Sequence, residues 1–214
     1  MSLIALDASV AQAGLALLDA GGQVKGNWSA PLKPGLIETL PMLLQTAASG
    51  QTITDIAVCT GPGSFTGLRT SIALAQGFAA GLGATLWGIP AWDAYCELLP
   101  KLNRPLWVAV QARRGRLFLL KDGSKAEAFA DDNLPVPEHP ITIAGEAAAL
   151  AAAFLSSRGA DVRLATSLTP DAACVGLAAL RHKRQGEPPK PALPLYIDPP
   201  EAKLPAAGLR PSPL

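Results

Sequence analysis

Residues 71–92 carry no charged side chain, and this uncharged stretch restricts the possible folds more than any other part of the chain. About 20 apolar residues in a row are enough to cross a bilayer as a helix. This stretch, however, contains four glycines and reaches the breaker Gly-Ile-Pro at residues 88–90. Such punctuation favours a buried helix followed by a short strand. We therefore predict that the stretch forms part of the core of a globular α/β protein and not a membrane span.

The composition fits a globular protein of one domain or two lobes. The chain has 214 residues, of which 49% are hydrophobic, enough for a sizeable core. Its formal net charge of +1 gives no field strong enough to collect RNA or anionic lipid without a partner. Three cysteines, Cys59, Cys96 and Cys174, lie far apart in apolar surroundings, and we interpret them as buried thiols of a cytoplasmic protein. The first residues lack the basic region of a signal peptide, so no export is expected.

The first half of the chain alternates strands and helices. Apolar or alternating runs predict a meander of three strands at residues 3–9, 13–19 and 22–29. The pattern then predicts a helix at 36–49, a strand at 55–60, the helix of the uncharged stretch, a strand at 84–89 and a helix at 91–99. An Asn-Arg-Pro turn near residue 103 marks a boundary. We predict a first lobe over residues 1–103.

The second half restarts with a predicted hairpin. Residues 106–123 form two alternating runs around a turn that contains arginine and glycine. Two helices are expected after it, at residues 145–159 and 168–186, the second with Thr169 as its N-cap and Pro170 at its first position. Prolines crowd the chain beyond Gly186, where little regular structure is expected. We predict a shortened second lobe with a proline-rich tail over residues 104–214.

A glycine-rich turn, CTGPGSFTGLRT at residues 59–70, precedes the uncharged helix. A phosphate loop needs a lysine and a hydroxyl after its last glycine, whereas Gly67 is followed by Leu-Arg. The dinucleotide fingerprint fails because the second interval between glycines is one residue too wide. A nucleophile elbow fails because Ser64 follows Gly63 directly. The turn therefore matches none of these three sites.

The histidines and cysteines do not form a recognisable site. His139 stands between an acid and a proline, and His182 stands at the basic end of a predicted helix, so we expect solvated or capping roles for both. No histidine pair has the spacing i, i+4, and no Cys/His cluster has ligand spacing. We predict no metal site.

One side of the uncharged helix lacks bulky side chains. Gly77 and Gly81 lie four residues apart on one side of the helix, with Ala73 and Ala80 nearby. Small residues let another helix backbone approach closely. The pattern leaves two interpretations open, because this side could be buried in the chain's own core or could dock a partner helix.

The turn after the first strand brings an acid and a hydroxyl together at Asp7 and Ser9. In actin-like ATPases, the amides of such a turn face phosphate while the acid holds a metal-bound water. An aspartate that only orders its own turn gives the same pattern. Asp7 and Ser9 are therefore the candidates for a vestigial phosphate turn.

Six segments together resemble the bacterial TsaB (YeaZ) family. They are LIALDAS at the start, ETLPMLL, GPGSFTGLRTSIALAQGFAAGLG, GIPAWDA, QARRGRLF and, late in the chain, PLYIDPPEAKLP. The family is a shortened member of the actin-like (ASKHA) superfamily. It is related to TsaD, which transfers threonylcarbamoyl to the adenosine beside the anticodon of certain tRNAs. The resemblance implies an α/β fold of two actin-like, ribonuclease H-like lobes, with mixed sheets flanked by helices and a reduced second lobe.

The resemblance also implies an accessory role. Members of the family are non-catalytic and pair with TsaD, or with themselves, through helices of the first lobe, and TsaE docks on the pair. ATP and metal would lie on the partner subunits, the chain would have no cofactor of its own, and it would meet tRNA only through the complex. The residues that match the family motif and would shape or form the interface are Gly61, Pro62, Gly63, Ser64, Phe65, Thr66, Gly67, Arg69, Ala73, Gly77, Ala80 and Gly81.

Three positions depart from the family pattern. Gly35 stands where relatives often have histidine, Gln111 where they often have aspartate, and Asp198 where they often have arginine. These departures leave the glycine-rich turn unchanged. They weaken the idea that the cleft binds a nucleotide by itself.

Two classes of function follow from these patterns. The first is an accessory subunit of the threonylcarbamoyl-transferring complex. The second is an enzyme, either a nucleotide hydrolase that uses Asp7 or an M22-type peptidase, and it would need a complete set of acid, metal and phosphate groups that the sequence lacks. A basic turn at Arg113, Arg114 and Arg116 is interpreted as a solvated hairpin tip rather than an RNA contact.

Overall fold

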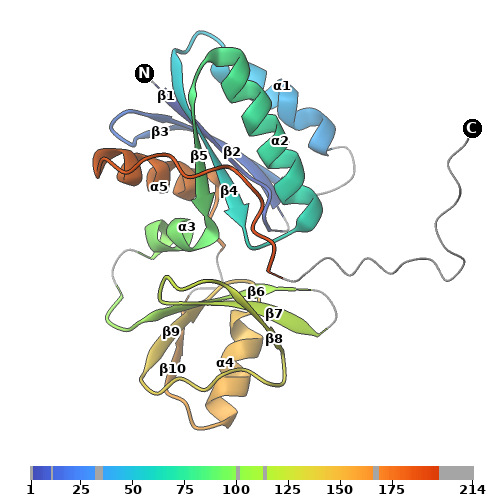
Figure 1. The fold of residues 1–214 in the computed structure, drawn as a ribbon, viewed down its shortest axis with the longest axis vertical. Helices are drawn as coiled ribbons and strands as arrows, with labels where there is room; N and C mark the ends of the chain where they lie inside the picture. Colours follow the sequence, from blue (N-terminus) through green and yellow to red (C-terminus); the bar gives the residue numbers. More distant parts are fainter. Residues whose placement is uncertain are drawn as a thin grey trace, which may run out of the picture.

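A computed structural model describes residues 2–10, 12–31, 36–99, 102–112, 115–165 and 169–197 of the chain. Figure 1 shows two lobes, each built on a five-stranded sheet with helices on its faces. Both sheets contain parallel and antiparallel pairs. The predicted fold class, two mixed sheets flanked by helices, is confirmed.

The first sheet is a meander extended by two parallel strands. Its strands are β1 (Ser2–Asp7), β2 (Gln12–Asp19), β3 (Val24–Pro31), β4 (Ile53–Gly61) and β5 (Thr85–Pro90), in the order β3-β2-β1-β4-β5. Successive side chains of a strand point to opposite faces. Leu3 of β1 therefore enters one core and Ile4 the other. Helices α1 (Leu36–Ala48) and α2 (Phe65–Leu82) cover the face of Ile4, whereas α3 (Ala91–Leu98) and α5 (Ala172–Arg184) cover the face of Leu3.

The second sheet begins with the predicted hairpin. Its strands are β6 (Leu106–Gln111), β7 (Arg116–Lys121), β8 (Glu127–Ala130), β9 (Ile141–Ala144) and β10 (Val162–Leu164), in the order β10-β9-β6-β7-β8. Helix α4 (Ala148–Ser157) packs on one face of this sheet. On the other face, Val108 and Val110 pack with Tyr95 of α3. This apolar layer joins the two lobes.

The chain returns to the first lobe after the second sheet. Figure 1 shows α5 and the segment after it, in orange and red, beside the first sheet. Val175 and Ala178 of α5 are fully buried in a core that also contains residues of β1, β2 and β4. The prediction of one continuous second lobe over residues 104–214 is therefore wrong, because the apolar side of α5 completes the core of the first lobe.

Two local points of the prediction need correction. Helix α5 begins after Asp171, whose carboxylate accepts a hydrogen bond from the amide of Cys174 at 3.0 Å, so Thr169 is not the N-cap. Helix α1 spans Leu36–Ala48, close to the predicted 36–49, and includes Pro41. The short strands β8, β9 and β10 were not predicted, because runs of 3 or 4 residues are too short to show a period.

Two further predictions, that no helix spans a membrane and that the three cysteines are buried, can be compared with the structure. Among the described helices, none is long and apolar enough to cross a membrane. Cys59 is buried as predicted, but Cys96 and Cys174 are only half-buried, so the prediction of three buried thiols is wrong for those two. Burial, followed by the negative charge of Asp7, raises the pKa of the Cys59 thiol well above its usual range.

Candidate functional site

The glycine-rich turn connects β4 to α2 and packs against the turn that follows β1. Ser64 is the N-cap of α2, and its hydroxyl accepts a hydrogen bond from the amide of Gly67 at 3.3 Å. The amide of Ser64 donates to the carbonyl oxygen of Ser9 at 2.6 Å. The structure thus brings together the two turns that the sequence had marked separately.

Two glycines of this turn allow the close approach. A Cβ atom on Gly63 would collide with the carbonyl oxygen of Ser9, and one on Gly67 would collide with that of Ala8. Gly61 has a φ of +100°, which few other residues adopt. The buried residues of the turn are Gly61, Pro62 and Gly67, and the half-buried ones are Gly63 and Ser64. These residues hold α2 in position, so they would shape a contact surface through the placement of that helix.

One face of α2 is open to solvent. Leu68 and Ile72 lie on the opposite side and are buried against the sheet. Among the described residues, a Cβ atom on Gly77 or Gly81 would meet no other atom within 4 Å. The small-residue side is therefore not buried among the described residues of the chain, and docking of a partner helix there stays a prediction. The exposed predicted residues of this helix face are Phe65, Thr66, Arg69, Ala73, Gly77, Ala80 and Gly81.

Arg69 is the only charged residue of α2 and is held by two aromatic rings. Its guanidinium carbon lies 3.8 Å from the ring centroid of Phe65. Its Nε donates a hydrogen bond to the hydroxyl of Tyr196 at 2.8 Å, and the two rings have centroids 6.1 Å apart. Phe65 is 49% exposed and Tyr196 is 52% exposed. The first turns of α2 therefore carry an ordered, exposed cluster of Phe65, Arg69 and Tyr196, which we call the Arg69 cluster.

Tyr196 reaches α2 on a segment that follows α5, residues 187–197, which we call the C-terminal arm. The amide of Gly88 in the edge strand β5 donates to the carbonyl oxygen of Lys190 at 2.9 Å. The side chain of Gln76 on α2 donates to the carbonyl oxygen of Ala192 at 2.9 Å. A side chain at position 88 would collide with the backbone of the arm. The arm thus covers part of the sheet edge and fixes Tyr196 beside the open face of α2.

Asp7 lies at the end of β1 and is only 5% exposed. One carboxylate oxygen accepts a hydrogen bond from the amide of Ser9 at 2.8 Å. Burial raises the pKa of Asp7 to about 6, and the hydrogen bonds from Ser9 offset only part of this effect. The turn is thus ordered by its own aspartate, and its backbone is engaged by the glycine-rich turn.

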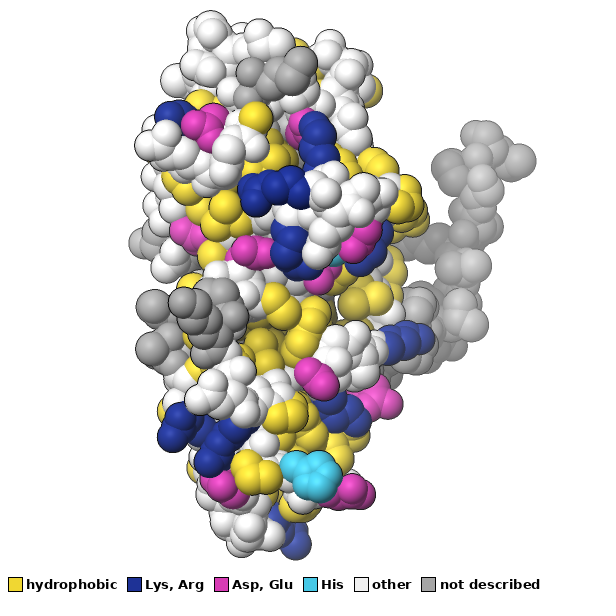
Figure 2. Space-filling view, turned by 90° about the vertical axis from the view of Figure 1, so that its left-hand side faces the viewer, with side chains coloured by type: hydrophobic (Ala, Val, Ile, Leu, Met, Phe, Trp, Pro, Cys, Tyr) yellow, Lys and Arg dark blue, Asp and Glu magenta, His cyan; other side chains and the backbone are white. Residues whose placement is uncertain are grey.

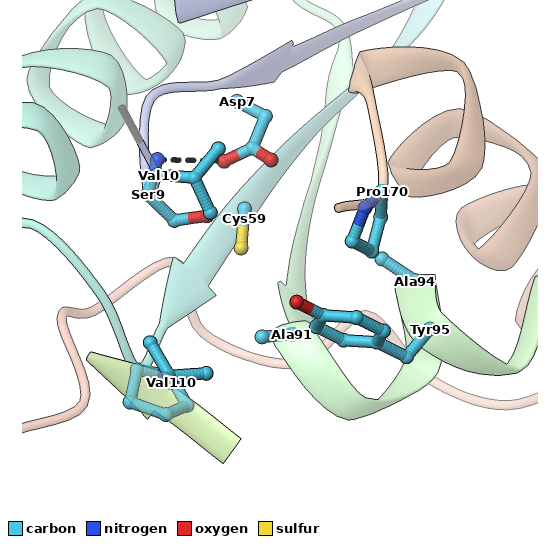
Figure 3. A pocket seen from close by; sticks show the side chains of 10 residues that line it. Asp7, Ser9, Val10, Cys59, Ala91, Ala94, Tyr95, Val110 and Pro170 are labelled. Carbon is cyan, nitrogen blue, oxygen red and sulfur yellow. Dashed lines mark hydrogen bonds between the residues drawn. The ribbon is translucent and has the colours of Figure 1, made fainter. Parts of the chain in front are cut away.

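A small cavity lies next to Asp7, at the contact between the two lobes. Asp7, Cys59 and Tyr95 line it from the first lobe and Val110 from the second, as Figure 3 shows. Its volume is about 10 Å³, which holds about one water molecule and no nucleotide. Nothing in the sequence pattern distinguished Tyr95 from the other apolar residues of its helix.

The basic end of α5 is surrounded by acids. Figure 2 shows dark blue and magenta side chains intermixed on the first lobe. Arg181 pairs with Glu97 of α3 at 2.6 Å, and Lys183 pairs with the buried Asp55 at 2.6 Å. His182 is buried, with its ring nitrogens 3.1 Å from Asp93 and 2.6 Å from Glu187. The predicted solvated or capping role is wrong for His182, which ties α5 to α3 and to the start of the arm.

The remaining marked residues contribute little to a site. His139 is exposed, and the exposed Gln111 donates to the carbonyl oxygen of Ala112 at 3.0 Å. Within the described ranges, no three His, Cys, Asp or Glu side chains are grouped so that they could hold a metal ion. The predictions for Gly35, Arg113, Arg114 and Asp198 lie outside the described residues.

Fold and site together define a two-lobed α/β protein with an open helix face on its first lobe. The chain belongs to the TsaD family, whose model, described as tRNA N6-adenosine threonylcarbamoyltransferase, matches residues 36–160, more than half of the chain. A comparison with curated proteins finds no match.

Two solved structures from Pseudomonas aeruginosa have the same fold. One is described as an uncharacterized protein with similarity to peptidase YeaZ; it has 23% identity and a TM-score of 0.71, and the match covers 92% of this chain and 99% of that one. The other is YeaZ, with 23% identity, a TM-score of 0.70 and coverage of 91% and 99%. Together with the family match, this likeness of fold confirms the resemblance found in the sequence.

Proposed function

We propose that this chain is a non-catalytic accessory subunit of the assembly that transfers threonylcarbamoyl to the adenosine beside the anticodon of tRNA. It pairs with a TsaD subunit through the open face of α2, and the pair supports docking of TsaE. ATP and metal lie on the partner subunits, and tRNA is met through the complex. The pairing takes place in the cytoplasm, and without TsaD two copies of the chain pair with each other.

The open face of α2 is the observation that carries this proposal. A helix inside a globular protein normally gains its stability by burying one face, and its other face is usually polar. The outer face of α2 instead presents Ala73, Gly77 and Gly81, with the Arg69 cluster at one end. Small residues permit close helix contact, and aromatic and arginine side chains are enriched where binding energy is concentrated. The surface therefore has the composition of a helix-docking interface.

The cavity beside Asp7 supports the accessory role over an enzymatic one. A nucleotide hydrolase needs room for phosphates next to its acid, whereas this cavity has a volume of about 10 Å³. The backbone of the Asp7 turn is already in contact with Ser64, Gly63 and Gly67 of the glycine-rich turn. A phosphate that approached the turn from this side would have to displace these contacts.

Reconstitution tests the proposal directly. TsaC, TsaD, TsaE, tRNA, ATP, threonine and bicarbonate are combined with and without this chain, and threonylcarbamoyladenosine is measured in the tRNA by mass spectrometry. We expect product only when the chain is present. Equal product in its absence would contradict the accessory role.

A matched pair of variants connects the activity to the surface. Ala73→Leu adds bulk to the open face of α2, and Ala153→Leu adds the same bulk to an exposed position of α4 in the second lobe. We expect Ala73→Leu to weaken pairing with TsaD at least about tenfold, or about 1.4 kcal/mol, because the helices can no longer approach closely. Ala153→Leu should pair like the parent chain. Analytical ultracentrifugation of the mixtures measures both, and an unchanged affinity for Ala73→Leu would contradict the assignment of this face.

A further inference from the structure

The cavity beside Asp7 lies where the two lobes meet. Its walls come from the end of β1, the end of β4, α3 and β6 of the second lobe. Through Val110 and Tyr95 it borders the apolar layer that joins the two lobes. Whatever fills this space therefore affects how the lobes hold together.

The hydroxyl of Tyr95 is aimed into this cavity without a protein partner. Tyr95 is 1% exposed, and its hydroxyl oxygen has no hydrogen bond among the described residues. Figure 3 shows the hydroxyl pointing toward the space beside Cys59 and Ala91. Leaving a buried hydroxyl unpaired is costly, so native structures almost always supply a partner from the protein or from water.

Asp7 provides a matching acceptor on the same cavity. Its Oδ1 accepts the hydrogen bond from the amide of Ser9, and the carboxyl group keeps further capacity to accept. Burial raises the pKa of Tyr95 far above its usual range, and the charges of Glu146, Asp7 and Cys59 raise it further, so its hydroxyl stays a donor. The groups that face Asp7 in turn are Ser9, Cys59 and Asp171, none of which is cationic. The cavity therefore pairs one donor with one acceptor and offers no counter-charge for an ion.

The volume of the cavity matches the space that one buried water molecule needs. A buried water molecule needs a cavity of about 10–15 Å³ and 2 to 4 polar partners. The cavity has about 10 Å³ and, with Asp7, Ser9 and Tyr95, enough polar groups. A larger ligand would have to displace the walls.

We propose that this cavity binds a single water molecule that accepts a hydrogen bond from Tyr95 and donates one to Asp7, and that this bridge helps to hold the two lobes closed. The water lies beside the carboxyl group of Asp7, at the contact between the first and second lobes. Closure of the lobes then needs no nucleotide, which suits a subunit that acts as a rigid partner.

The direction in which one substitution changes the Tm tests the water bridge. Tyr95→Phe removes only the hydroxyl and keeps the ring. If the hydroxyl binds water, its loss leaves the water and Asp7 short of a partner, and the Tm of the full chain should fall by about 2–4 °C. If the cavity is dry, removal of an unpaired buried hydroxyl should raise the Tm, and this result would overturn the proposal. Tyr196→Phe is the matched control: it removes a hydroxyl that accepts one hydrogen bond, from Arg69, on a half-exposed residue, and it should change the Tm less.

A high-resolution crystal structure of the parent chain and of Tyr95→Phe gives an independent measurement. We expect one water within hydrogen-bond distance of both Tyr95 Oη and an Asp7 carboxylate oxygen in the parent. In the variant, that density should be lost or weakened. A parent cavity with no density, or a direct hydrogen bond between Tyr95 and Asp7, would rule out the water bridge.

Discussion

Helices α2 and α5 cover opposite faces of the same sheet, yet they use glycine in opposite ways. Gly176 of α5 faces the sheet, where an added Cβ would lie 2.5 Å from Leu18 and 3.2 Å from Ala5. Gly77 and Gly81 of α2 face away from the sheet, where an added Cβ would meet nothing within 4 Å in the part of the chain that the structure describes. The same residue type thus brings one helix close to its own core and leaves the other helix accessible from outside.

This difference shows which glycines belong to the fold and which are available for a partner. A glycine in the middle of a helix costs about 0.5–1 kcal/mol relative to alanine. At Gly176 close packing against β1 and β2 compensates for that cost. At Gly77 and Gly81 no contact among the described residues offsets it. The proposed pairing with TsaD would provide the missing compensation.

The largest expected effect is a loss of stability when bulk is added to α5. Gly176→Leu overpacks the space between α5 and the sheet, and we expect the free energy of unfolding to fall by about 2–3 kcal/mol. The same change on the open helix, Gly77→Leu, should not lower it and should raise it by no more than about 1 kcal/mol, because leucine has a higher helix propensity than glycine. Urea unfolding of the two variants measures both quantities. Equal losses at the two positions would remove the distinction between the helices.

A second effect concerns the acid on the α5 side of the sheet. The pKa of Asp7 is raised from 3.8 to about 6, so the folded chain binds its proton more tightly than the unfolded chain. Stability from this group is complete below about pH 4 and is lost as the pH rises through about 6, by up to about 3 kcal/mol. Asp7→Asn removes the titration but keeps an acceptor for the Ser9 amide.

The measurement for Asp7 is the difference in unfolding free energy between the two proteins. Asp7→Asn should become more stable relative to the parent chain between pH 4 and pH 7, and the difference should level off above that range. Urea titrations at several pH values follow the trend. A difference that stays constant over this range would show that Asp7 is not the buried, weakly compensated acid described above.

The smallest expected effect is a gain in stability on the open helix. Gly77→Ala adds a methyl group that meets none of the described residues, and it reduces the freedom of the unfolded chain. We expect the free energy of unfolding to rise by about 0.5–1 kcal/mol. Thermal unfolding of the chain without partners measures the change. A loss of stability would mean that position 77 has contacts in the folded chain.

Much of the fold could be predicted from the sequence because periodicity is local. The apolar run in residues 3–9 and the breakers around the uncharged stretch predicted a strand and a helix that the structure contains. The destination of α5 could not be predicted, since the apolar pattern of a helix does not state which sheet it covers. The spacing of Gly77 and Gly81 likewise predicted a helix that packs closely, but it did not show whether the helix packs against the chain's own core or against another protein.

The site was less accessible to sequence reasoning because its contacts join distant segments. Arg69 and Tyr196 are 127 positions apart, and only the fold shows that the arm brings them together. Tyr95 lies on the buried side of its helix, and the sequence gives no sign of whether its hydroxyl has a partner. The turn at Asp7 and Ser9 was identified, but its contact with the glycine-rich turn depends on the pairing of β1 with β4.

The return of α5 and the arm to the first lobe also sets an order for folding during synthesis. The sheet strands of the second lobe, residues 106–164, are complete in the chain before α5 at residues 172–184 has been made. Until α5 emerges, the face of the first sheet that contains Leu3 and Ala5 lacks its main cover. The lobe that begins the chain is therefore the last to be finished, and a ribosome that stalls after the second lobe would release a chain with an exposed apolar sheet.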